Sequence, residues 1–206
     1  MALTLWGRVN SINVQKVLWC MQETGQPFER IDAGRGFGVT DTPEYRAMNP
    51  NGLVPTLRDG DFVLWESNAI VRYLATKFCR GMLAPEDPQH FADADRWMDW
   101  QQTVLNPALG PAFHGLVRSP GSRGPAEVEQ SRVQTEAAMA ILEAHLSGRE
   151  YLAAESYTMA EGVVGASVHR WLNLPIAREV RPAVQGWYVR LMQRPAAKHI
   201  FRLPIT

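Results

Sequence analysis

Residues 53–78 read LVPTLRDGDFVLWESNAIVRYLATKF. Two apolar runs flank Asp59-Gly60, and Asp-Gly between such runs predicts a β-hairpin, because both central residues of the turn must tolerate a positive φ. From Glu66 to Phe78 the apolar residues return at the spacing of a half-buried helix. The stretch therefore predicts a ββα unit whose first strand opens with Val54-Pro55.

The residues before this unit alternate between strand and helix signals. We expect strands over residues 3–7 and 28–32, and helices over residues 13–24 and 42–48. Residues 1–79 thus have the order strand, helix, strand, helix, hairpin, helix (βαβαββα). A βαβ unit followed by a ββα unit makes a small mixed sheet with helices on its faces.

Strand signals end after this domain. Residues 80–87 contain glycine and proline and are typical of a linker. Residues 88–206 are expected to be all helical, with irregular chain around the four prolines between positions 107 and 125. The expected helices cover residues 91–105, 127–146, 159–172 and 182–192.

The charge balance excludes several classes of partner. Among the 206 residues, Lys plus Arg number 21 and Asp plus Glu number 21, so the formal net charge is zero. Residues 1–80 carry nine basic and eight acidic groups, and residues 81–206 carry twelve and thirteen. No segment is basic enough to follow a phosphate backbone, so we expect no nucleic-acid partner.

Cys20 and Cys79 are the only cysteines, and neither belongs to a CxxC pair or a zinc-like cluster. We therefore expect no metal site, and two thiols in a chain of this length fit a reducing compartment. The apolar stretch at the amino terminus is too short for a signal peptide. No other apolar stretch approaches the ~20 residues that a membrane span needs. We expect a cytoplasmic protein with no membrane contact.

Polar residues flank the first expected helix. Ser11 and Asn13 stand between the first strand and that helix. Either could simply cap the helix, because Ser and Asn are preferred N-caps. Alternatively, a hydroxyl beside a helix amino end could stabilise an anion such as a thiolate.

Two further features lie at the ends of the hairpin strands. Val54-Pro55 opens the first of them, where a proline is tolerated without any special role. Glu66-Ser67 stands where the second strand becomes a helix, and again either residue could serve only as a cap. Together they could instead hold a carboxylate at the helix end and an ammonium at the glutamate, the two groups of the γ-glutamyl end of glutathione.

Taken together, these features resemble the glutathione S-transferase family. The matching stretches are SINVQKVLW, NPNGLVPTL and LWESNAIVRYLA in the first domain, and TMAE at residues 158–161 in the second. The resemblance spans essentially the whole chain and is closest to bacterial serine-type members that are theta-like or nu-like. It implies a thioredoxin-like domain, an all-helical domain, a homodimer and glutathione as co-substrate.

The resemblance also assigns roles to particular residues. Ser11 matches the hydroxyl that faces the glutathione sulfur, and Asn13 matches a second polar group of some bacterial members. Val54 matches the residue whose backbone pairs with the cysteinyl part, ahead of a cis-proline at Pro55. Glu66 and Ser67 match the pair that holds the γ-glutamyl group.

The chain departs from the family pattern at some positions. Leu53 stands where many relatives carry a polar or basic side chain for the glycyl carboxylate. No cysteine stands at positions 11–13, unlike the thiol-active types, and Cys20 fits the core. Glu161 replaces the usual Asp of a capping box, which we interpret as structural. We interpret residues 34–38, GRGFG, as a flexible loop bordering the site, because they lack the spacing of a dinucleotide loop.

The resemblance implies an enzyme that activates the glutathione thiol as a thiolate for attack on a hydrophobic electrophile. We expect the electrophile to be held against the helical domain, with Trp100, Val104 and Phe113 as candidate walls, although such aromatics are as typical of a core. Two alternatives stay open: glutathione-dependent disulfide or peroxide reduction, and a non-catalytic binding or interaction protein with the same fold.

Overall fold

The computed structural model describes residues 3–201 and 205–206. Residues 1–2 and 202–204, which belong to the ends of the two expected domains, lie outside that description. The chain divides into two compact units, Met1–Ala84 and Pro85–Thr206. Each unit has its own hydrophobic core, and each is described separately below.

The first unit has the thioredoxin-like order expected from the sequence. Its sheet has the strand order β2-β1-β3-β4, with β1 parallel to β2 and antiparallel to β3, and β3 antiparallel to β4. The strands are β1 (Leu3–Trp6), β2 (Phe28–Ile31), β3 (Thr56–Asp59) and β4 (Phe62–Trp65). The helices are α1 (Ile12–Thr24), α2 (Pro43–Met48) and α3 (Ser67–Phe78), with a short 3-10 turn η1 (Arg35–Phe37).

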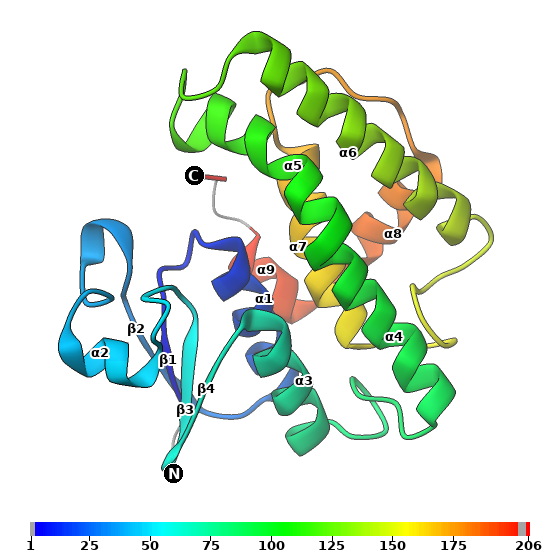
Figure 1. Ribbon diagram of the computed structural model, residues 1–206. Helices are drawn as coiled ribbons and strands as arrows, with labels where there is room; N and C mark the ends of the chain where they lie inside the picture. The colour runs from blue at the N-terminus through cyan, green and yellow to red at the C-terminus, as the bar shows by residue number, and fades with distance from the viewer. Residues whose placement is uncertain (1–2, 202–204) are drawn as a thin grey trace. The chain divides into compact units, whose positions relative to one another are not determined.

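Helices cover both faces of this sheet (Figure 1). On one face α1 packs along α3, and Val17 of α1, Leu74 of α3 and the sheet residues Leu5 and Leu57 are all fully buried. On the other face Tyr45 of α2 packs with Trp6 and nearby apolar residues. Alternate residues of β1 therefore point to opposite cores, as a strand requires.

The hairpin turn lies one residue later than the sequence pattern indicates. Asp59 is the last residue of β3 and pairs with Phe62, so Gly60 and Asp61 are the two turn residues. Gly60 supplies the positive φ, 62°. The expectation that Asp59-Gly60 forms the turn is therefore wrong by one residue.

The second unit is helical, as expected. Its long helices are α4 (Pro88–Trp100), α6 (Pro125–Leu146), α7 (Met159–Leu172) and α8 (Pro182–Gln193), with a short α9 (Pro195–Ile200) near its end. Helix α7 is the centre of this unit, because twelve of its fourteen residues are buried. Within the described ranges, no helix is both long and apolar enough to cross a membrane.

The expectation of irregular chain around Pro107 and Pro111 is wrong. The chain stays helical from α4 through a π-helical turn η2 (Gln101–Leu105), α5 (Asn106–Phe113) and a second π-helical turn η3 (His114–Arg118). Pro107 lies in the first turn of α5, where its missing N–H costs little. Next to Pro111, the Ser131 hydroxyl accepts from the N–H of Ala112 and donates to the carbonyl of Ala108, so the disturbed backbone groups are satisfied.

The start of α7 is closed by a reciprocal capping box. The Thr158 hydroxyl accepts from the backbone N–H of Ala160, and the Glu161 carboxylate accepts from the backbone N–H of Thr158 at 2.8 Å. Glu161 also accepts from the N–H of Leu152 at 2.7 Å, so it ties the preceding loop to the helix. Burial raises the pKa of the Glu161 carboxyl to about 7. The structural role expected for this motif is confirmed.

Candidate functional site

Two hollows of the first unit share part of their lining at the ends of β1 and the start of β3. The larger holds about 280 Å³ and the smaller about 40 Å³. Residues Asn13, Leu53 and Val54 line both. The larger is also lined by Arg8, Ser11, Gly34, Arg35, Thr40 and Gly52, and the smaller by Asn49, Asn51, Pro55, Glu66 and Ser67. All six residues singled out from the sequence thus meet around one pair of joined hollows.

Ser11 occupies the N-cap position of α1, but its side chain makes no capping hydrogen bond. Its backbone is fixed, because its N–H donates to the carbonyl of Arg8 at 3.2 Å and its carbonyl accepts from Gln15 at 2.9 Å. The residue is 7% exposed, and in the described part of the chain its hydroxyl has no hydrogen-bond partner. The hydroxyl therefore remains available to a ligand in the larger hollow.

Asn13 does not cap the helix, contrary to one of the alternatives left open by the sequence. It is the second residue of α1, and its Oδ1 is buried without a partner among the described residues. Buried polar atoms are usually hydrogen-bonded, so an orphaned one at the wall of two hollows is a candidate contact for a ligand.

Val54 has backbone groups that no other described residue pairs with. The peptide bond between Val54 and Pro55 is cis, as the resemblance implies. Strand β3 begins only at Thr56, so the ladder with β1 does not reach Val54. Its N–H and C=O are free to pair with an extended peptide in the manner of an added strand.

Two side chains that sequence reasoning missed hold this turn in place. The hydroxyl of Tyr45 and the amide of Asn49 donate to the carbonyl of Leu53, at 2.7 and 2.9 Å, and Asn49 also donates to Thr56 Oγ1 at 3.1 Å. Tyr45 is 1% exposed, and burial raises the pKa of its phenol. Asn49 begins the segment NPNG, which was the available signal for a structured turn.

Glu66 and Ser67 join β4 to α3 through a strained backbone. Glu66 has φ 72° and ψ 112°, which costs a residue other than glycine about 1–3 kcal/mol. Its side chain is exposed and makes no capping bond. Ser67 is the first residue of α3, is 3% exposed, and its hydroxyl has no partner in the described ranges. Neither residue behaves as a simple cap.

Two arginines also line the larger hollow, and neither was singled out from the sequence as a site residue. Arg8 follows β1, and Arg35 begins the short turn η1 in the segment that was expected to be a flexible loop bordering the site. Burial, and then the charge of Arg35, lower the pKa of the Arg8 guanidinium from its usual value. The hollow therefore combines a serine hydroxyl, two guanidinium groups and the amino end of α1, which together favour an anionic ligand.

The candidate wall residues of the helical unit differ from one another. Val104 is 42% exposed and Trp100 is partly buried. Phe113 is 1% exposed, with the guanidinium of Arg170 at 3.8 Å and that of Arg118 at 4.8 Å from its ring centre. Phe113 is therefore a core residue of this unit, and its expected role as a wall is not supported.

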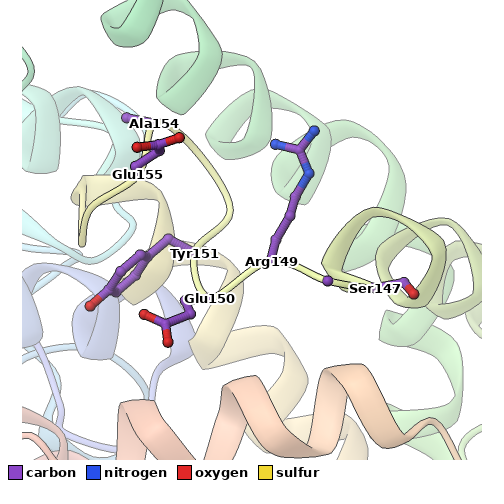
Figure 2. A pocket seen from close by; sticks show the side chains of 7 residues that line it. Ser147, Arg149, Glu150, Tyr151, Ala154 and Glu155 are labelled. Carbon is purple, nitrogen blue, oxygen red and sulfur yellow. The ribbon is translucent and has the colours of Figure 1, made fainter.

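A third hollow, of about 500 Å³, lies in the loop between α6 and α7 (Figure 2). Its lining is formed by residues between Ser147 and Glu155, including Arg149 and Tyr151. None of the residues singled out from the sequence lines it. In the described part of the chain, no group of three His, Cys, Asp or Glu side chains is arranged to hold a metal ion.

Comparisons with known proteins agree with the fold of both units. The sequence model for "Glutathione S-transferase, N-terminal domain" matches residues 1–76, and that for "Glutathione S-transferase, C-terminal domain" matches residues 104–195. The chain is 39% identical over 207 aligned residues to glutathione S-transferase GstB of Escherichia coli K12, covering 99% of this chain and 100% of that protein.

Solved structures give the same result. The theta class glutathione S-transferase of Xanthomonas axonopodis pv. citri, with glutathione bound, aligns with a TM-score of 0.95 and 42% identity over 100% of this chain and 99% of its own. Glutathione S-transferase I of maize, in complex with an atrazine glutathione conjugate, aligns with a TM-score of 0.90 and 26% identity, covering 98% and 97% of the two chains.

Proposed function

The chain belongs to the glutathione S-transferase family, and from this premise we propose that it binds glutathione in the two joined hollows and activates the thiol through Ser11. It is a glutathione transferase, which transfers alkyl or aryl groups to the glutathione sulfur. The observation that carries the proposed site is the meeting of all six predicted residues, with two serine hydroxyls not used for capping.

To activate glutathione, the protein must lower the pKa of its thiol. A free thiol has a pKa of about 8.5, and a value of roughly 6–7 would leave a large fraction ionised at neutral pH. A shift of two units corresponds to about 2.7 kcal/mol. A hydrogen bond to a charged acceptor gives about 1.5–3 kcal/mol, and a helix amino end adds about 0.3–1 kcal/mol. The Ser11 hydroxyl and the amino end of α1 can therefore supply the shift.

The remainder of glutathione has complementary groups at hand. We place its cysteinyl backbone against the unpaired N–H and C=O of Val54, ahead of Pro55. Its γ-glutamyl carboxylate would accept from the Ser67 hydroxyl at the amino end of α3, and its ammonium would face the Glu66 carboxylate. Asn13, which lines both hollows, is placed beside the cysteinyl residue.

The thiolate then attacks a hydrophobic electrophile. The sulfur forms the new bond to carbon, and the leaving group departs with its electron pair. Phe113 is buried in the core of the helical unit and is no longer a candidate contact for that electrophile.

Parallel assays decide between conjugation and reduction. The protein would be given glutathione with a chloronitrobenzene, a hydroperoxide and a small disulfide, beside a calorimetric titration with glutathione alone. We expect binding and thioether formation with the aromatic chloride. Turnover of only the peroxide or the disulfide would assign a reductase, and binding without any turnover would assign a non-catalytic role.

We further propose a homodimer in the cytoplasm. The strand β4 at the edge of the sheet exposes Phe62 and Trp65, at 48% and 37%, and such apolar side chains suit a protein contact. The free, buried cysteines Cys20 and Cys79 suit a reducing compartment. Light scattering at micromolar concentration tests the assembly, since a single species near the chain mass of 23.1 kDa would refute the dimer.

A further inference from the structure

Lys16 is buried in the interface between α1 and α3. It is 1% exposed, and its Nζ donates at 2.9 Å to Oδ1 of Asn68, which is 7% exposed. A lysine is almost never fully buried without a partner, because its ammonium group loses its hydration there. Replacing both partners of a buried polar pair by apolar groups of the same shape is often nearly neutral or stabilising. Stability alone therefore does not account for this pair.

Helices α1 and α3 lie side by side and run in the same direction (Figure 1). Lys16 contacts Asn68, which is 52 positions later in the chain. About one turn further along both helices, the Cys20 thiol lies 3.7 Å from the carbonyl of Val71, which is 51 positions later. Because this offset stays nearly constant, the amino ends of the two helices lie at the same end of the pair.

The register between the helices sets the separation of the two serines at their amino ends. At the offset of 52, Ser67 is level with residue 15, four positions after Ser11, or about 6 Å further along the helix axes. In the proposed function, Ser11 contacts the glutathione sulfur and Ser67 the γ-glutamyl carboxylate. The covalent skeleton of glutathione fixes the span between those two groups. Both contacts can therefore form together at only one register of the helices.

Apolar packing does not by itself hold this register. Val17 of α1 and Ile70 and Leu74 of α3 are fully buried, but burial of apolar surface is non-directional and tolerates sliding. A hydrogen bond depends on distance and angle and weakens steeply when its groups are displaced. The bond between Lys16 and Asn68 therefore opposes sliding of one helix along the other.

We propose that Lys16 and Asn68 are positioning residues for thiol activation, because their bond fixes the register at which one glutathione molecule reaches both Ser11 and Ser67. Neither residue belongs to the lining of the two hollows, so the pair acts through the helices and not by touching the ligand. The inference rests on the proposed function and extends it to residues behind the site. A displacement of about 1 Å at a reacting group can cost roughly 100-fold in rate.

The test separates position from stability with the double variant Lys16→Met/Asn68→Leu. Both partners become apolar and no buried polar group loses its partner, so the free energy of unfolding should stay near the wild-type value. The register is no longer held by a directional bond, so kcat/KM for glutathione with a chloronitrobenzene should fall roughly 10- to 100-fold. The pKa of the bound thiol should rise toward that of free glutathione. A role in folding alone would leave both quantities unchanged in this variant.

Two further variants keep the outcome clear. Lys16→Met alone removes the bond with a single change and should show the same losses if the double variant does not fold. Thr158→Ala is the matched control, because it removes a capping hydrogen bond in the helical unit and lowers stability away from the site. It should leave kcat/KM and the thiol pKa at their wild-type values.

The proposal also predicts a coupling with Ser67. In the wild type, Ser67→Ala should weaken glutathione binding, because the γ-glutamyl contact is made together with the contact at Ser11. In the Lys16→Met/Asn68→Leu background the two contacts are no longer aligned, so the same substitution should weaken binding by a smaller factor. An equal factor in both backgrounds would overturn the proposal.

Failure of this proposal and failure of the proposed function look different. A double variant with the kcat/KM and the thiol pKa of the wild type would overturn the positioning role alone. So would a loss of kcat/KM in Thr158→Ala as large as that in Lys16→Met, because reduced stability would then explain both. A wild type that neither binds nor conjugates glutathione would overturn the proposed function, and this inference with it.

Discussion

Lys16 Nζ on α1 donates a hydrogen bond of 2.9 Å to Asn68 Oδ1 on α3. Both residues are buried, with exposures of 1% and 7%. Asn68 directly follows Ser67, and Lys16 lies on the helix that begins after Ser11. The bond therefore ties together the two helices whose amino ends form the candidate site.

This bond predicts an asymmetry between two substitutions. Asn68→Ala takes a partner away from a buried ammonium and should lower the free energy of unfolding by about 1.5–3 kcal/mol. Lys16→Met removes the charge and keeps the aliphatic stem, so it should cost less, about 1 kcal/mol. Chemical denaturation of both variants at neutral pH measures the difference. A larger loss for Lys16→Met would mean that the ammonium stabilises the fold through other contacts.

Ser67→Ala should separate binding from stability. No hydrogen bond to its hydroxyl is lost in the unliganded protein, so the melting temperature should change little. If the hydroxyl donates to the γ-glutamyl carboxylate, glutathione binding should weaken by about 1–3 kcal/mol. Titration calorimetry and a thermal melt on the same two proteins give both quantities. A lower melting temperature with unchanged binding would return Ser67 to a purely structural role.

Thr158→Ala is the opposite case. The substitution removes the hydroxyl of the α7 capping box and should lower the free energy of unfolding by about 0.5–2 kcal/mol. Glutathione affinity, measured below the unfolding transition, should stay at the wild-type value. An unchanged free energy of unfolding would show that the Glu161 contacts alone hold the start of the helix.

The sequence was sufficient for the order of strands and helices in the first unit, because the apolar spacing and the glycine positions agree with that part of the fold. It misplaced the hairpin turn by one residue, since tertiary contacts decide the end of β3. Asp59 accepts from the hydroxyl of Tyr73 at 2.7 Å and pairs with Lys77, and both donors lie on α3. Local turn preferences cannot include these partners.

Helix α5 was missed for a similar reason, namely a contact between residues that are distant in sequence. Pro107 and Pro111 correctly lower the local preference for a helix. The backbone groups beside Pro111 are satisfied by Ser131 of α6, twenty residues further along the chain. Local sequence preferences around Pro111 do not take account of a contact with a residue so far along the chain.

The six residues singled out from the sequence follow a local motif, whereas Arg8 and Arg35, which also line the larger hollow, do not. These arginines come together because β1 and β2 are parallel, with Trp6 beside Ile31 at their carboxyl ends. The pairing brings the two following loops to one edge of the sheet. The predicted βαβ unit implied that the first two strands are parallel. Which residues of the two strands pair with each other was not specified by the sequence alone.

His169 gives the protein a measurable pH dependence. It is 5% exposed, its Nδ1 lies 2.7 Å from the Tyr188 hydroxyl, and burial lowers its pKa to about 4 from the usual 6.5. Because the folded-state pKa is depressed, the contribution of neutral His169 is complete above pH 6.5 and is lost as pH falls toward 4. The loss should reach about 3 kcal/mol, and His169→Gln should lack it.

Glu161 changes the stability in the opposite direction over the same pH range. The pH dependence of the wild-type unfolding free energy therefore does not report on His169 alone. The folded-state pKa of Glu161 is raised to about 7, and its contribution is complete below about 4.5 and is lost as pH rises through 7. The informative quantity is the difference in unfolding free energy between wild type and His169→Gln across pH 4–7. A difference that is constant with pH would contradict a neutral, buried His169.

The central claim is that Ser11 holds the glutathione thiol as a thiolate, and Asn13 contributes little to helix stability. The most direct measurement is the ultraviolet thiolate absorbance of bound glutathione, followed against pH in wild type, Ser11→Ala and Asn13→Ala. We predict a wild-type pKa roughly two units below the free value of about 8.5, and a rise of about one to two units in Ser11→Ala with glutathione affinity little changed. If the thiol pKa of bound glutathione in Ser11→Ala equals that of the wild type, the account is contradicted, whatever the pKa in Asn13→Ala.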